Sequence, residues 1–127
     1  MPVSAPGQRW NIEITDDYLQ WFRALDEGQQ DALRTDIEIL EQMGPALGRP
    51  QVDSIKGSRH SNMKELRTMH ARRQVRSFFA FDPRRTAILL IGGDKTGKRR
   101  FYERMVPLAD RLFDQYLADI RKEGLIP

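Results

Sequence analysis

The chain has 127 residues and a mass of 14.8 kDa, with 39% hydrophobic and 31% charged residues. This length predicts a single domain over residues 1–127, with a flexible segment at residues 1–8. The chain contains no cysteine, which excludes a disulfide scaffold, a thiolate nucleophile and a sulfur-ligated zinc site. The start lacks the apolar run of a signal peptide. The longest apolar run, residues 87–91, is far below the ~20 residues of a membrane span, so we expect a soluble, cytoplasmic protein.

Charge is distributed unevenly along the chain. Residues 1–50 hold 4 Lys/Arg against 9 Asp/Glu, residues 51–104 hold 14 against 5, and residues 105–127 hold 3 against 4. A basic middle between acidic ends indicates a face that binds a polyanion. A solvated charged surface would give the same counts, so charge alone does not decide between the two.

The first third of the chain predicts one strand and two helices. Apolar and polar residues alternate over residues 9–14, as in a half-buried strand. Apolar residues at helical spacing then predict helices over 16–25 and 29–43, which form an antiparallel hairpin. Gly44 and Pro45 end the second helix, because glycine takes the left-handed cap and proline cannot continue the helix.

The remainder predicts a meander and a final helix. Residues 44–62 are polar, with a short extended piece at 52–55, and three strands follow over 63–68, 74–81 and 86–92. The third strand is apolar on both faces and should be central. A loop is expected at 93–97, and residues 99–105 read either as extended chain or as the lead into a helix. Pro107 suits the first turn of a helix over 108–123.

This order predicts an α+β fold. Its parts are a small antiparallel sheet, an N-terminal helical hairpin and a C-terminal helix, with the helices packed on one face of the sheet. The basic charges fall mainly on the meander and its loops, so the uncovered face of the sheet is the expected place for a polyanion.

One motif resembles a nucleotide-binding loop without meeting its requirements. Residues 92–98 fit the spacing of the phosphate-binding loop, but Arg99 stands where Ser or Thr should hold magnesium. No parallel-sheet context is expected either, so the motif disfavours nucleotide hydrolysis. The glycines shape a tight loop that presents Lys95 and Lys98.

The two histidines, His60 and His70, lack the spacing of a metal site, and neither a metal nor another cofactor is expected. A surface histidine is the simplest interpretation of both, and His70, beside several arginines, is also a candidate acid or base.

Arg76 and Tyr102 each allow two interpretations. Arg76 lies in a phenylalanine-rich strand, where a guanidinium serves either as an ion-pair partner or as a phosphate clamp. Tyr102 is either a core aromatic, a ring that stacks on an unpaired base, or a phenol near a scissile phosphate. If Leu66 points to the core, Glu65 and Arg67 share the opposite face and Lys64 reaches the rim.

Several segments, in order, resemble the phage-derived Gp49-like branch of the RelE/HigB toxins. They cover about residues 10–123 and are Asn62–Arg67, Val75–Arg85, Ala87–Gly97, Arg100–Glu103 and Ala109–Leu112. The turn at residues 71–74 departs from the pattern, because it lacks the glycine and proline of this branch.

The resemblance implies a type II toxin that cleaves messenger RNA on the ribosome and is silenced by a helix-turn-helix, HigA-like antitoxin. The family's basic and aromatic positions imply catalytic roles for Lys64, Arg67, Arg76, Lys95 and Tyr102. The neighbouring cations expected to bind RNA are His70, Arg72, Arg73, Lys98 and Arg100. RNA is cut without metal or cysteine if its own 2′-hydroxyl attacks the adjacent phosphate, assisted by a base, an acid and cations.

Two other functions remain open at this point. ParE toxins share the fold and poison DNA gyrase by binding, and fold-level similarity does not separate binding from cleavage. A module that binds RNA without cutting it is the third possibility. The dense set of basic residues on the meander favours the nuclease.

Overall fold

The computed structural model describes residues 9–127, so the flexibility expected of residues 1–8 lies outside the described residues. The elements follow the predicted order with shifted boundaries: β1 (Asn11–Ile14), α1 (Asp16–Arg23), α2 (Glu27–Met43), a 3₁₀ turn (Gly44–Ala46), β2 (Val52–Ser54), β3 (Lys64–His70), β4 (Arg73–Asp82), β5 (Thr86–Asp94) and α3 (Phe101–Lys122). The predicted α+β fold is confirmed.

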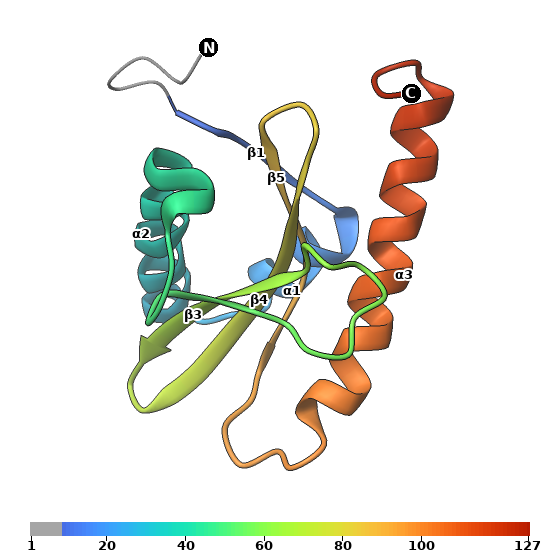
Figure 1. Cartoon of the computed structure of the whole chain (residues 1–127). Helices are drawn as coiled ribbons and strands as arrows, with labels where there is room; N and C mark the ends of the chain where they lie inside the picture. The colour runs from blue at the N-terminus through green and yellow to red at the C-terminus, as the bar shows by residue number, and fades with distance from the viewer. Residues whose placement is uncertain (1–8) are drawn as a thin grey trace.

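The strands form one sheet in the order β1-β5-β4-β3-β2 (Figure 1). The predicted meander is β3-β4-β5, and β2 adds to it in the antiparallel sense. β1 pairs with β5 in parallel, from Asn11 opposite Thr86 to Ile14 opposite Leu89, so the sheet is mixed and not wholly antiparallel. The apolar β5 thereby gains a neighbour on each edge, as its predicted central position requires.

Helices cover both faces of the sheet, which corrects the prediction that they pack on one face. α1 and α2 contribute Tyr18 and Leu33 to a core with Phe79 of β4, while α3 packs on the opposite face against Phe78. Consecutive buried phenylalanines point to opposite faces of a strand, so both faces need a cover. The sequence predicted an open face for a polyanion. On the face of the sheet where α3 packs, only β3 and the start of β4 are left for that role (Figure 1).

α3 begins at Phe101, seven residues before the predicted start at Leu108. Pro107 lies inside the helix and not in its first turn. An interior proline costs about 3 kcal/mol, but Phe101 and Met105 lie one turn apart and are both buried. Burial of each such side chain contributes roughly 1.5–3 kcal/mol, which offsets the proline and extends the helix. No helix within residues 9–127 has both the length and the apolar character to cross a bilayer.

Two glycines in β5 let helices approach the sheet closely from both sides. A Cβ on Gly92 would lie 2.2 Å from Cζ3 of Trp21 in α1, and a Cβ on Gly93 would lie 2.8 Å from Cε1 of Phe101 in α3. Both belong to the strand, which extends into the loop predicted over 93–97. They serve helix packing and not the tight loop that the sequence suggested.

The turn between β3 and β4 holds two residues in left-handed conformations. Ala71 has φ 48° and Arg72 has φ 66°, the backbone of a two-residue hairpin turn that ordinarily carries Asn-Gly. An L-residue in this region costs about 1–2 kcal/mol. The turn therefore holds local strain at an exposed arginine.

We expect the double substitution Ala71→Asn and Arg72→Gly to raise the free energy of unfolding by about 1 kcal/mol, because it relieves this strain. Urea unfolding of the two proteins measures the difference. Gly97→Ala is the matched control: Gly97 has φ +69° in open space, so the alanine should lower stability by a similar amount. An unchanged or lower midpoint for the double variant would contradict the strain.

Candidate functional site

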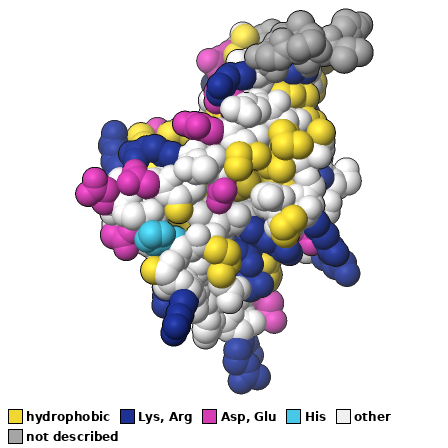
Figure 2. Space-filling view, turned by 90° about the vertical axis from the view of Figure 1, so that its left-hand side faces the viewer, with side chains coloured by type: hydrophobic (Ala, Val, Ile, Leu, Met, Phe, Trp, Pro, Cys, Tyr) yellow, Lys and Arg dark blue, Asp and Glu magenta, His cyan; other side chains and the backbone are white. Residues whose placement is uncertain are grey.

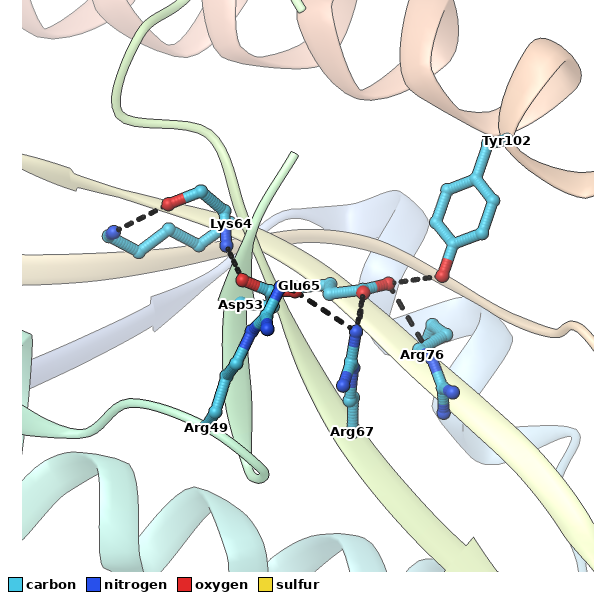
Figure 3. Close-up of polar contacts among 8 residues, drawn as sticks. Arg49, Asp53, Lys64, Glu65, Arg67, Arg76 and Tyr102 are labelled. Atoms are coloured by element: carbon cyan, nitrogen blue, oxygen red, sulfur yellow. Dashed lines mark hydrogen bonds and ion pairs between the residues drawn. The ribbon is translucent and has the colours of Figure 1, made fainter. Parts of the chain in front are cut away.

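Three of the five residues expected to be catalytic converge on a buried carboxylate, that of Glu65 (Figure 3). The Tyr102 hydroxyl donates to Oε1 of Glu65 at 2.7 Å, and Nε of Arg76 lies 3.5 Å from the same oxygen. Nε and Nη2 of Arg67 donate to Oε2 at 3.2 and 3.1 Å. Glu65 is only 3% exposed, so the carboxylate exchanges water for these donors.

Strand register explains why these groups meet. Glu65 and Arg67 share one face of β3, as the two-residue period predicts, and Arg67 stands directly opposite Arg76 of β4. Like charges directly opposite each other destabilise a strand pair. The Glu65 carboxylate between the two guanidinium groups removes that repulsion.

Arg76 is both an ion-pair partner and an incompletely satisfied donor. It is 6% exposed, and its Nη1 donates to the carbonyl of Val75 at 3.1 Å. Its buried Nε makes no hydrogen bond among the described residues, because the approach to Glu65 is long. The ion pair that the sequence left open is therefore present, and the Nε atom of Arg76 is enclosed beside Glu65 without a hydrogen bond of good geometry in the described part of the chain.

Tyr102, in the first turn of α3, faces the sheet. Burial raises the pKa of its phenol, and the hydrogen bond to Glu65 raises it further, with a smaller opposing contribution from Arg76. Nζ of Lys95 lies 5.4 Å from the ring centroid, within range of a cation–π contact. Lys95 thus joins the site as the fourth expected residue, through the ring of Tyr102.

A second carboxylate supports the first from β2. Asp53 lies 3.2 Å from Nη2 of Arg67 and 3.0 Å from Nη2 of Arg49. The hydrogen bond from Arg49 lowers the pKa of Asp53, and Arg67 lowers it less strongly. The guanidinium of Arg67 is thus held between two carboxylates, which fixes its orientation although it remains a third exposed.

Lys64 is the expected catalytic residue that the structure separates from the others. Lys64 precedes Glu65 in β3, so its side chain points to the opposite face of the strand. Its Nζ lies 3.5 Å from Oγ of Ser54 in β2. This is the rim position that the strand period predicts.

The expected RNA-binding residues surround the site without forming one cluster. His70 lies against Gly28 at the start of α2, Arg72 is exposed at the hairpin tip, and Nε of Arg73 pairs with Asp94 at 2.6 Å. Lys98 and Arg100 line an open pocket of about 420 Å³ at the start of α3. Figure 2 shows Lys and Arg side chains projecting from the end of the molecule that holds this loop and the hairpin tip.

Sequence reasoning placed Glu65 on the correct face but did not identify it as the centre of the site. It also missed Asp53 and Arg49. The signal that was available is the predicted pairing of two arginine-bearing strands, since facing cations require a nearby anion. Within residues 9–127, no three His, Asp or Glu side chains are grouped closely enough to hold a metal ion.

Comparison with known proteins identifies the family. Residues 20–114 match the model described as phage-derived protein Gp49-like. The chain belongs to this family. It is 46% identical over 100 residues to HigB2 and to HigB3 of Mycobacterium tuberculosis (strain ATCC 25618 / H37Rv), both named as toxins. The matches cover 77% and 78% of this chain, and the chain spans 50% of the length of HigB2 and 86% of HigB3.

A solved structure confirms the RelE-like fold. The crystal structure of the archaeal RelE–RelB complex from Pyrococcus horikoshii OT3 aligns with a TM-score of 0.50 and 13% identity, over 69% of this chain and 97% of that chain. The RelE/HigB-like assignment made from the ordered motifs is thereby confirmed.

We expect Glu65→Ala to lower the free energy of unfolding by about 3 kcal/mol, because it leaves two facing guanidinium groups without their counter-ion. Urea unfolding measures the loss. Glu103→Ala is the control: its side chain is 77% exposed and lies 3.9 Å from Arg100, so its removal should change stability by less than about 0.5 kcal/mol. If the two substitutions lowered the free energy of unfolding equally, Glu65 would not be the counter-ion on which the two arginines depend.

Proposed function

We propose that this Gp49-like protein is the toxin of a type II toxin–antitoxin system and acts as a metal-independent endoribonuclease on messenger RNA bound to the ribosome. The observation that carries the proposal is the convergence of Arg67, Arg76 and Tyr102 on one carboxylate. A fixed pair of guanidinium groups is suited to a phosphodiester, and a phenol beside them is suited to proton transfer.

The proposed reaction begins with attack of the RNA 2′-hydroxyl on the adjacent phosphorus and ends with departure of the 5′-oxygen. Negative charge grows on the non-bridging oxygens during attack, where preorganised cations stabilise it most. Arg76 is rigid on a central strand and Arg67 is held by two carboxylates, so neither reorients during the reaction. This rigidity supports catalysis and exceeds what simple binding requires.

The basic surroundings supply the attraction for a polyanion. Lys98, Arg99 and Arg100 are exposed in the loop between β5 and α3, and Arg72 is exposed at the hairpin tip. Exposed cations of this kind raise affinity in a salt-dependent manner and carry little information about base identity. We assign them to RNA binding and the Glu65 cluster to cleavage.

We expect expression of the protein to arrest growth and to deplete full-length messages. Mapping of 5′ ends in arrested cells tests this directly. Intact messages together with inhibited gyrase would assign the protein to the ParE class. Intact messages together with retained RNA binding would indicate that the protein binds RNA without cutting it.

We expect Arg76→Lys to reduce single-turnover cleavage about 10²–10³-fold, because lysine keeps the charge but loses the planar set of donors. The lysine variant is preferred to alanine because Arg76 is buried beside Glu65. Lys98→Ala provides the contrast: it should weaken RNA binding and lower its salt slope by about one. A cleavage rate near that of the wild type for Arg76→Lys would show that Arg76 has only a structural role, as the ion-pair partner of Glu65.

We further propose that a helix-turn-helix, HigA-like antitoxin binds the side of the molecule opposite α3. A largely apolar pocket of about 290 Å³ opens between β1, α1 and α2, and its apolar lining includes Ile14, Leu19, Phe22 and Ile37. Figure 2 shows hydrophobic side chains gathered on the face that α2 covers. The acidic N-terminal segment makes this face suited to a protein partner and unsuited to RNA.

We expect Ile14→Asp to abolish co-purification of the protein with its co-expressed helix-turn-helix antitoxin, because it places a charge in the proposed apolar contact. Ile14 is 45% exposed, so the fold should tolerate the change. Met43→Asp is the matched control, since Met43 is 46% exposed and lies outside the pocket lining. Co-purification that survives Ile14→Asp would place the antitoxin elsewhere.

A further inference from the structure

The hydrogen bond between Tyr102 and Glu65 limits what the phenol can do for a substrate. A phenolic hydroxyl has one proton and otherwise only acceptor capacity. That proton is donated to Oε1 of Glu65 at 2.7 Å. Toward any other group the Tyr102 oxygen acts as an acceptor, which is the role of a base and not of an acid.

Burial divides the pair into an accessible member and an enclosed one. Glu65 is 3% exposed and lies beneath Arg67 and Tyr102, so a ribose does not reach its carboxylate directly. Tyr102 is half-buried and lines a pocket of about 300 Å³ with Lys56 and Gly57. That volume is at the lower end of the range of small-ligand sites. Of the two groups, the phenol is therefore the one that a substrate can contact.

We propose that Tyr102 and Glu65 form a proton relay that serves as the general base for RNA cleavage. The inference rests on the proposed nuclease function. The 2′-hydroxyl gives its proton to the phenol oxygen while the phenol gives its own proton to Oε1 of Glu65. The O2′–P bond forms, the P–O5′ bond breaks, and the 5′-oxygen takes a proton from water. Glu65 then returns its proton to solvent through Tyr102, which restores the site.

The relay resolves the difficulty that each group would meet alone. Burial and Glu65 raise the pKa of the phenol, so a free phenolate base is disfavoured at neutral pH. In the relay, the phenol is neutral before and after transfer, and the negative charge moves from the carboxylate to the oxygens of the phosphate under attack. The cations that face the pair, Arg67 and Arg76, remain beside the phosphate throughout.

The charged groups that face Glu65 are Arg67 on β3, Arg76 on β4 and, through Arg67, Asp53 on β2. Lys95 faces Tyr102 on its ring.

The test is single-turnover cleavage of ribosome-bound message by Tyr102→Phe, Glu65→Gln and the double variant, each checked for folding by thermal melting. Each single variant should lose about 10²–10⁴-fold in rate, and the double variant should be no slower than the slower single variant, because relay partners act as a unit. Tyr116→Phe and Glu13→Gln are the matched controls. The Tyr116 hydroxyl also donates from α3 to a carboxylate, that of Glu13, away from the site.

A second substrate separates a base from an acid. A 5′-bridging sulfur makes the leaving group depart without a proton, so it rescues the loss of an acid but not the loss of a base. We expect Tyr102→Phe to remain slow on this substrate. Rescue to the wild-type rate, or a Tyr102→Phe rate near wild type on ordinary RNA, would overturn the relay.

Each failure can be assigned. A wild-type protein that leaves messages intact removes the proposed nuclease function, and the relay with it. Wild-type cleavage combined with active Tyr102→Phe removes only the relay. If Glu65→Gln melts below the assay temperature, Tyr102→Phe decides, because it retains the ring and loses only the hydroxyl.

Discussion

The arrangement of the site depends on one electrostatic constraint: two arginines face each other on neighbouring strands and need an anion between them. Arg67 and Arg76 are cross-strand partners in the meander. Facing cations would weaken this pairing, and Glu65 supplies the compensating charge from the same face of β3. The contact that stabilises the hairpin is thus also the contact that aligns the guanidinium groups. Stability and the proposed chemistry share the same atoms.

Local patterns in the sequence predicted most of the fold, and long-range pairing accounts for the rest. Helical spacing and strand alternation gave the correct order of elements, because those periods are local properties of the chain. The parallel pairing of β1 with β5 and the second helical layer were missed. Both depend on which apolar faces meet in three dimensions. The start of α3 was misplaced because Pro107 was given more weight than the buried face that continues through it.

The candidate site was predictable in its residue types and less so in its geometry. The motifs selected Arg67, Arg76 and Tyr102, and the structure brings these together. They also selected Lys64, which the two-residue period already directed to the rim. Glu65 was overlooked because the segment was interpreted from its excess of basic residues, and a single acidic residue there suggests no role by itself. Its importance emerges only once strand register places two cations around it.

The close packing of α3 on Gly93 links the interior of the sheet to the candidate site. Phe101 occupies the space that a side chain at position 93 would fill, and Tyr102 is its neighbour in the same helical turn. The missing methyl group therefore sets the height of the first turn above the strands. The distance between the Tyr102 phenol and the Glu65 carboxylate therefore depends on a residue of β5, which lies two strands away from Glu65 in the sheet. A larger residue at position 93 would change the distance between Tyr102 and Glu65 without replacing any group that takes part in the proposed chemistry.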